Sequence, residues 1–109
     1  MGKILYSDSD IIIEFDDRAL THLQIVIGAK LRRRESFFFS WRDHEAVGNG
    51  PSSIWMDSAI PLYFKFSGGK MPTINREWVK ILTDSANSGQ GLIYSDEPGV
   101  PSQAPRGHV

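Results

Sequence analysis

The spacing of hydrophobic residues alternates along this chain between two periods, and this alternation constrains the fold more than any other feature. Six short segments place an apolar side chain at every second position, which is the period of a β-strand. Only two segments place them three and four positions apart, which is the period of a helix with one buried side. The strand segments are Lys3–Tyr6, Ile11–Phe15, Ser36–Arg42, Ser53–Asp57, Leu62–Phe66 and Gly91–Tyr94.

The two helical segments carry the end signals of short globular helices. The first follows Asp16 and Asp17, which are suited to an N-cap, and runs to about Arg33. Its acidic start and basic end both interact favourably with the helix dipole. The second covers Arg76–Ala86, after a capping Asn75. The apolar stripes are Leu20, Leu23, Ile27 and Leu31 in the first helix, and Trp78, Leu82 and Ala86 in the second.

The resulting order, ββαβββαβ, predicts an α+β fold. Two helices can cover only one face of a sheet of this size, and short turns favour antiparallel neighbours. We therefore expect a largely antiparallel sheet with both helices on one face. A chain of 109 residues is long enough to form one hydrophobic core. Residues 1–95 are predicted to form this single domain, and the proline-rich residues 96–109 a flexible tail.

The composition excludes several classes of protein. The chain has no cysteine, so disulfide scaffolds, iron–sulfur clusters and thiol nucleophiles are excluded. A chain that folds without disulfides fits a reducing cytoplasm, which is the expected location. The apolar runs are too short for a membrane span, so no membrane partner is expected. The formal net charge of -1 gives no overall attraction to nucleic acid or to membranes.

One face of the predicted sheet is expected to carry aromatic side chains away from the helices. Strand alternation places Phe38, Trp55 and Tyr63 on this face. Three such rings would expose roughly 450–600 Å², at or above the largest apolar patch of a typical monomer. Three explanations remain open. The last strand, the tail or the loop Asp43–Pro51 covers the face; a second copy covers it in a homodimer; or a ligand binds there.

A second surface feature is the basic cluster at the end of the first helix, formed by Lys30, Arg32, Arg33 and Arg34. Together with Arg42 and Lys65 on the aromatic side of the sheet, these cations would resemble a platform that stacks the bases of a single strand. The alternative is that the cluster neutralises the helix dipole and keeps the surface soluble. The nearly balanced charge favours this alternative over nucleic-acid binding.

No arrangement of residues predicts catalysis, and no cofactor or metal is expected. The histidines, His22, His44 and His108, are scattered, and none has a partner at a metal-ligand spacing. His22 is interpreted as an ordinary residue on the flank of the first helix. The chain has no nucleophile elbow and no complete phosphate-binding loop. These observations favour a binding module over an enzyme.

Three long segments resemble a small bacterial family of chains of about this length, which has no established function. The segments are DRALTHLQIVIGAKLRRRESFFFSW, SSIWMDSAIPLYFKFSG and INREWVKILTDSANSGQGL. Members of that family often carry the label ATP-dependent DNA ligase. The label implies a lysine that takes up AMP within a K-x-D-G motif. The nearest segment here is Lys65-Phe66-Ser67-Gly68, in which serine replaces the aspartate, so we predict that the chain does not ligate DNA.

The sequence therefore predicts a non-enzymatic interaction module, a homodimer that associates through its aromatic sheet face. The alternative is a protein that binds nucleic acid or a nucleotide. The residues expected to bind in one case or the other are Phe38, Arg42, Trp55, Tyr63, Lys65, Arg32, Arg33 and Arg34.

Overall fold

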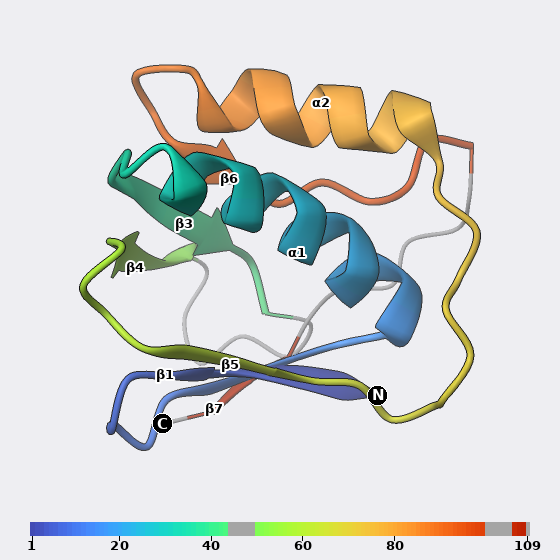
Figure 1. Ribbon diagram of the computed structural model, residues 1–109, viewed down its shortest axis with the longest axis horizontal. Helices are drawn as coiled ribbons and strands as arrows, with labels where there is room; N and C mark the ends of the chain where they lie inside the picture. Colours follow the sequence, from blue (N-terminus) through green and yellow to red (C-terminus); the bar gives the residue numbers. More distant parts are fainter. Residues whose placement is uncertain (44–49, 100–105, 109) are drawn as a thin grey trace.

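The computed structural model describes residues 1–43 and 50–99 and the backbone of residues 106–108 (Figure 1). The elements follow the predicted order, with one more strand near the C-terminus. They are β1 (Gly2–Tyr6), β2 (Ile12–Phe15), α1 (Asp17–Arg32), β3 (Phe37–Trp41), β4 (Ser52–Met56), β5 (Leu62–Lys65), α2 (Arg76–Ala86), β6 (Leu92–Ile93) and β7 (Arg106–His108).

The strands form two sheets. In the first sheet the order is β5-β1-β2-β7, and all neighbours are antiparallel. In the second, β3 lies between an antiparallel β4 and a parallel β6. The α+β class and the dominance of antiparallel pairs are thus confirmed, but the one sheet expected from the sequence is divided into two.

The division occurs after β4. Residues 57–61 turn the chain so that β5 pairs with β1, with Leu62 opposite Tyr6, and not with β4. The period of two assigns each residue to a face of its strand, but it does not say which strand lies beside which. The pattern of the sequence therefore predicted the strands β1 to β6, but it could not predict this division or the strand β7.

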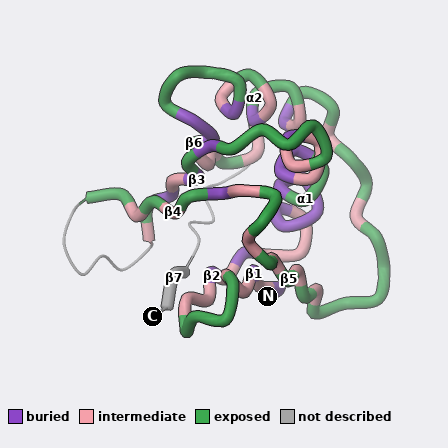
Figure 2. Tube along the Cα trace, turned by 60° about the vertical axis from the view of Figure 1, so that its left-hand side comes forward, coloured by how far each residue is buried: buried purple, intermediate pink, exposed green. Residues whose placement is uncertain are grey.

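The two helices pack on the side of the sheets that faces the core. Figure 1 shows α1 above the sheet that contains β1, β2 and β5, and α2 beside α1 on the side away from that sheet. The same helix α2 also packs against β6 of the second sheet. Half of the residues of α1 are buried, whereas the turn after β1 and most of the segment after β5 are exposed (Figure 2).

The hydrophobic core joins the two sheets. The ring of Phe15 on β2 contacts the rings of Phe39 on β3 and of Tyr94, with centroids 6.1 and 5.2 Å apart. Along β3 the predicted alternation is confirmed, because the odd-numbered residues Phe37, Phe39 and Trp41 are buried and Phe38 is exposed. Each sheet thus has one face in the core and one face directed away from it.

Both predicted N-caps are confirmed. The carboxylate of Asp16 accepts a hydrogen bond from the backbone N–H of Ala19 at the start of α1. The side-chain oxygen of Asn75 accepts from the backbone of Glu77 and Trp78 at the start of α2. Among the described residues, no helix is long and apolar enough to cross a membrane.

The segment after residue 95 is described only in part. Glu97 forms an ion pair with Arg18 of α1, and the backbone of β7 pairs with β2. Residues 100–105 and 109 lie outside the described residues. The flexible tail expected over residues 96–109 therefore stays a prediction.

Candidate functional site

Two aromatic side chains form an exposed pair on the outer face of the second sheet. Phe38 of β3 lies directly opposite Trp55 of β4, and their rings meet edge to face with centroids 5.0 Å apart. Phe38 is 52% exposed and Trp55 44%. Ile93 of β6, opposite Ser40 on β3, is also 44% exposed. We call Phe38, Trp55 and Ile93 the aromatic face.

The backbone around this pair is held at two points. The hydroxyl of Tyr6 on β1 donates a hydrogen bond to the carbonyl oxygen of Trp55 and so ties the edge strand β4 to the first sheet. Gly91 has a positive φ of 82° and lies against the backbone of Phe38, where a Cβ would overlap the carbonyl oxygen. Only glycine adopts this φ without cost. Because glycine also has no Cβ, Gly91 allows β6 to approach β3 closely. The aromatic face is therefore built on a fixed backbone.

Tyr63 and Lys65 lie on a different surface. Both are on β5, and Tyr63, 59% exposed, is opposite Leu5 of β1, while Lys65 is opposite Lys3. They share the outer face of the first sheet, whereas Phe38 and Trp55 belong to the second. The structure therefore brings two of the three expected aromatic residues together and places the third elsewhere.

The basic cluster is partly used within the protein. The Arg32 side chain donates to the carbonyl of Gly28, one turn earlier in α1, and Arg33 forms an ion pair with Glu35 at 3.3 Å. Glu35 also pairs with Lys30, and both partners lower the pKa of its carboxyl. These contacts fit the interpretation that the cluster neutralises the dipole at the end of the helix. Arg34, with a positive φ of 58°, is exposed just before β3.

Arg42 is exposed directly after β3, at the opposite end of the strand from the basic cluster. Most of the loop Asp43–Pro51, which was considered as a cover for the aromatic residues, lies outside the described residues, namely residues 44–49. The indole N–H of Trp41 donates to Asp43 where the described part of this loop begins.

The segment that most resembles the ligase motif is bound to the start of α1. The carboxylate of Asp17 accepts hydrogen bonds from the backbone N–H and the hydroxyl of Ser67 and from the N–H of Gly68, at 2.8–3.1 Å. These donors, first the Ser67 N–H, hold the pKa of Asp17 below its usual value. Ser67 therefore has a structural partner at the position where the motif requires aspartate.

The sequence pattern does not predict the buried polar network that surrounds His22. His22 is completely buried, in contrast to the flank position expected for it. Its Nδ1 contacts the carbonyl oxygen of Arg18, and its Nε2 accepts from the N–H of Asn75, at 2.6 and 2.8 Å. Since a carbonyl can only accept, the proton lies on Nδ1. The ring also packs on Trp78, with centroids 4.6 Å apart.

Glu97 completes this network. Its carboxylate binds the Arg18 guanidinium with two hydrogen bonds and accepts another from the side-chain amide of Asn75. The bonds to Arg18 are the main reason why the pKa of Glu97 falls to about 2. A histidine between apolar helix positions gives a weak signal of burial, but one of its two partners, Asn75, is 53 residues away along the chain, so no spacing rule could identify it.

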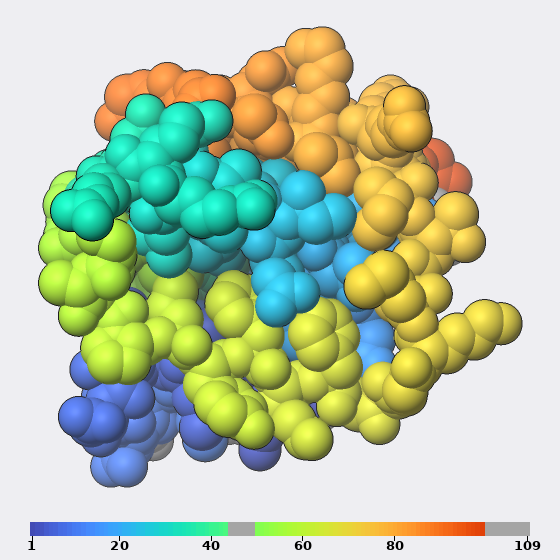
Figure 3. All heavy atoms as spheres, viewed as in Figure 1, coloured from blue at the N-terminus to red at the C-terminus, as the bar shows by residue number. Residues whose placement is uncertain are grey.

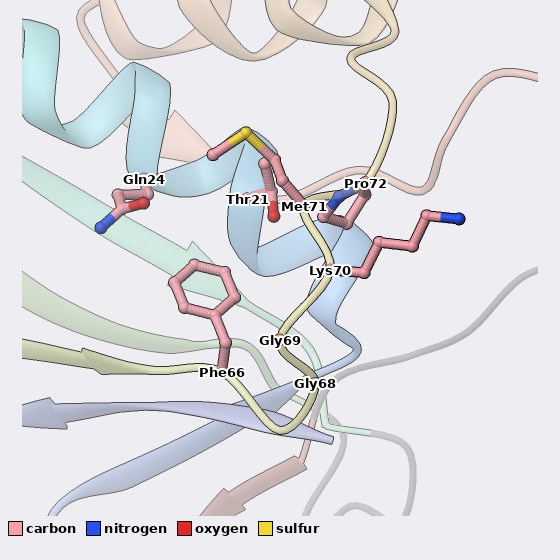
Figure 4. A pocket seen from close by; sticks show the side chains of 8 residues that line it. All are labelled: Thr21, Gln24, Phe66, Gly68, Gly69, Lys70, Met71 and Pro72. Atoms are coloured by element: carbon pink, nitrogen blue, oxygen red, sulfur yellow. The ribbon is translucent and has the colours of Figure 1, made fainter.

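A small cavity opens between α1 and the segment that follows β5. Its volume is about 190 Å³. Thr21 and Gln24 of α1 form one side, and Phe66, Met71 and Pro72 contribute to the other (Figure 4). Within the described part of the chain, no group of three or more histidine and acidic residues is arranged to hold a metal ion.

The chain was compared with known proteins. No curated protein and no solved structure gives a significant match. The model of one family, described as a domain of unknown function (DUF7882), matches residues 1–97, and the chain belongs to this family.

Proposed function

We propose that the protein is an interaction module that self-associates through the aromatic face. The observation that supports this proposal is the Phe38–Trp55 pair, in which two rings in mutual contact both leave about half of their surface exposed. Exposed aromatic side chains in contact with each other are typical of the centre of a protein interface. The lack of cysteine agrees with a function in the cytoplasm.

A second copy is a suitable occupant because the exposed side chains of the face are apolar. In a two-fold dimer each surface meets itself, so the aromatic pair of one copy would pack against the same pair of the other copy. Charged side chains would be excluded from this contact. The aromatic face consists of apolar side chains, with the hydroxyls of Ser40 and Ser53 hydrogen-bonded to each other between the strands at 2.7 Å.

The size of the aromatic face predicts a weak dimer. With roughly 200 Å² for a fully exposed ring, two half-exposed rings offer on the order of 200 Å², and Ile93 somewhat less than half as much again. A standard interface buries about 800 Å² of each partner. The face therefore supplies only the centre of such an interface, and we expect a dissociation constant of roughly 1–100 µM.

The test is the molar mass in solution as a function of protein concentration, measured by sedimentation or light scattering. The wild-type chain should shift from monomer to dimer as its concentration rises. Trp55→Asp should keep it monomeric, because a carboxylate cannot be buried there without a partner. Tyr63→Asp, at an exposed aromatic position on the other sheet, is the control and should leave the shift unchanged. A monomer at every concentration would refute the proposal.

The second candidate function is the binding of single-stranded nucleic acid at the end of the second sheet where β3 begins. It is favoured by one observation, that the exposed Arg34 lies only four residues before Phe38. Binding should weaken steeply between ~50 and ~200 mM salt and should be lost in Arg34→Ala. A titration that detects no binding of an oligonucleotide at the lower salt would refute it.

Under either function, we infer that the DNA ligase label does not describe an activity of this chain.

A further inference from the structure

The segment between β5 and α2, residues 66–75, crosses the first two turns of α1 and is held there by hydrogen bonds. We call this segment the strap. Three side chains of α1 bind its backbone: Asp17 at Ser67 and Gly68, Arg18 at Thr73, and His22 at Asn75. The strap is thus fixed at both of its ends, although it contains no helix or strand. A small cavity lies between the strap and α1.

The cavity lies under the middle of the strap, between its two fixed ends. In the view of Figure 3, the blue atoms of α1 meet the yellow atoms of the strap and of the end of β5 on this side of the molecule. Figure 4 shows the ring of Phe66 and the side chain of Gln24 at the cavity, with Met71 above Thr21 and the Lys70 ammonium pointing away. Met71 is 79% exposed, so it can move aside without disturbing the core.

The chemistry of the lining selects a class of ligand. We propose that this cavity binds a small, uncharged, planar aromatic molecule of one or two rings. An aromatic ring, a thioether and a proline ring line it, and each of these groups packs well against another aromatic ring. The volume of about 190 Å³ is suitable, since a cavity of about 150 Å³ binds benzene.

The polar groups nearby argue against a charged ligand. The nearest carboxylate, that of Asp17, already accepts three hydrogen bonds from the strap, and Lys70 is directed to solvent. The carboxamide of Gln24, which lines the cavity, can both donate and accept, so it can bind an N–H or a carbonyl of the ligand. Such a site distinguishes its ligand by shape and by one hydrogen bond rather than by charge.

The experiment uses indole as the probe and follows the amide resonances of the ¹⁵N-labelled full chain. Indole should bind with a dissociation constant on the order of 1 mM. The largest shifts should map to Thr21, Gln24 and the strap. Cyclohexanol, which is of similar size to a single ring but is not planar, should bind at least about tenfold more weakly.

Two variants locate the site. Gln24→Trp, at an exposed helix position, places a ring at the cavity and should abolish indole binding while the rest of the spectrum remains folded. Ile25→Trp adds the same ring at the next exposed position, which does not line the cavity, and should bind indole like the wild type. The proposal is overturned if indole causes no shifts up to several times that concentration, if the shifts map to the aromatic face, or if Gln24→Trp still binds.

Discussion

Arg18 and Glu97 bind each other across 79 positions of the chain, through hydrogen bonds of 2.7 and 2.6 Å from Nε and Nη2 of the guanidinium to the two carboxylate oxygens. This pair fixes the segment after β6 to the first turn of α1. The same guanidinium binds the strap at Thr73. The pair therefore connects three segments that are far apart in the sequence.

The Arg18–Glu97 pair should make stability depend on pH in the acidic range. The pKa of Glu97 is about 2 in the folded protein, against an ordinary value of 4.5, so its contribution is complete above pH 4.5 and is lost as the pH falls toward 2. Glu97→Gln should lower the free energy of unfolding by about 1–2 kcal/mol at pH 7. Urea denaturation at pH 7 and pH 3 measures this, and the difference between variant and wild type should shrink at pH 3. An equal difference at both values would contradict the assignment.

Loss of the His22 ring nitrogens should destabilise the fold although no charge is removed. His22→Phe has a similar shape but leaves the N–H of Asn75, which is partly buried, without an acceptor. An unsatisfied group of this kind costs about 1–3 kcal/mol. Denaturant unfolding checks the value, with Gln24→Ala on the exposed side of the same helix as the control. If both variants unfold at the same denaturant concentration, His22 has no such role.

Gly91 should tolerate no other residue. Gly91→Ala would impose a left-handed conformation that costs an L-residue about 1–2 kcal/mol, and its Cβ would overlap the Phe38 carbonyl. The total loss of stability should therefore exceed about 2 kcal/mol. Gly69→Ala is the matched control, because a Cβ there meets no atom within 4 Å, and it should change stability by less than about 0.5 kcal/mol. Amide exchange in β6 should increase only in the first variant.

The sequence predicted those features that depend on neighbours along the chain. The alternation that exposes Phe38 between two buried residues and the cap formed by Asn75 both follow from local spacing, and both are present. The separation of Trp55 from Tyr63 into two sheets depends on which strands pair. The burial of His22 depends on a donor, the N–H of Asn75, that another segment supplies. Such long-range choices are determined by packing, which a single sequence does not display.

Completing the ligase motif should damage the protein rather than create an activity. Ser67→Asp gives the chain a K-x-D-G segment, but it places a second carboxylate beside Asp17, whose ionised form is stabilised by the Ser67 N–H and hydroxyl. Like charges at this distance repel each other, so stability at pH 7 should fall by about 1–3 kcal/mol, and the loss should diminish as the pH drops below 4. Ser67→Ala, which removes only one hydrogen bond, should cost about 1 kcal/mol.

The same variants test the ligase label directly. After incubation with ATP and magnesium, the intact mass of the wild type and of Ser67→Asp should show no adenylate on Lys65. The first reason is that Lys65 lies on the outer face of the first sheet, opposite Lys3. The second is that the described residues contain no cluster of acidic and histidine side chains that could hold the metal ion of a bound triphosphate. A mass increase equal to one adenylate, abolished by Lys65→Met, would overturn this prediction and restore the nucleotidyl-transfer activity that the label implies.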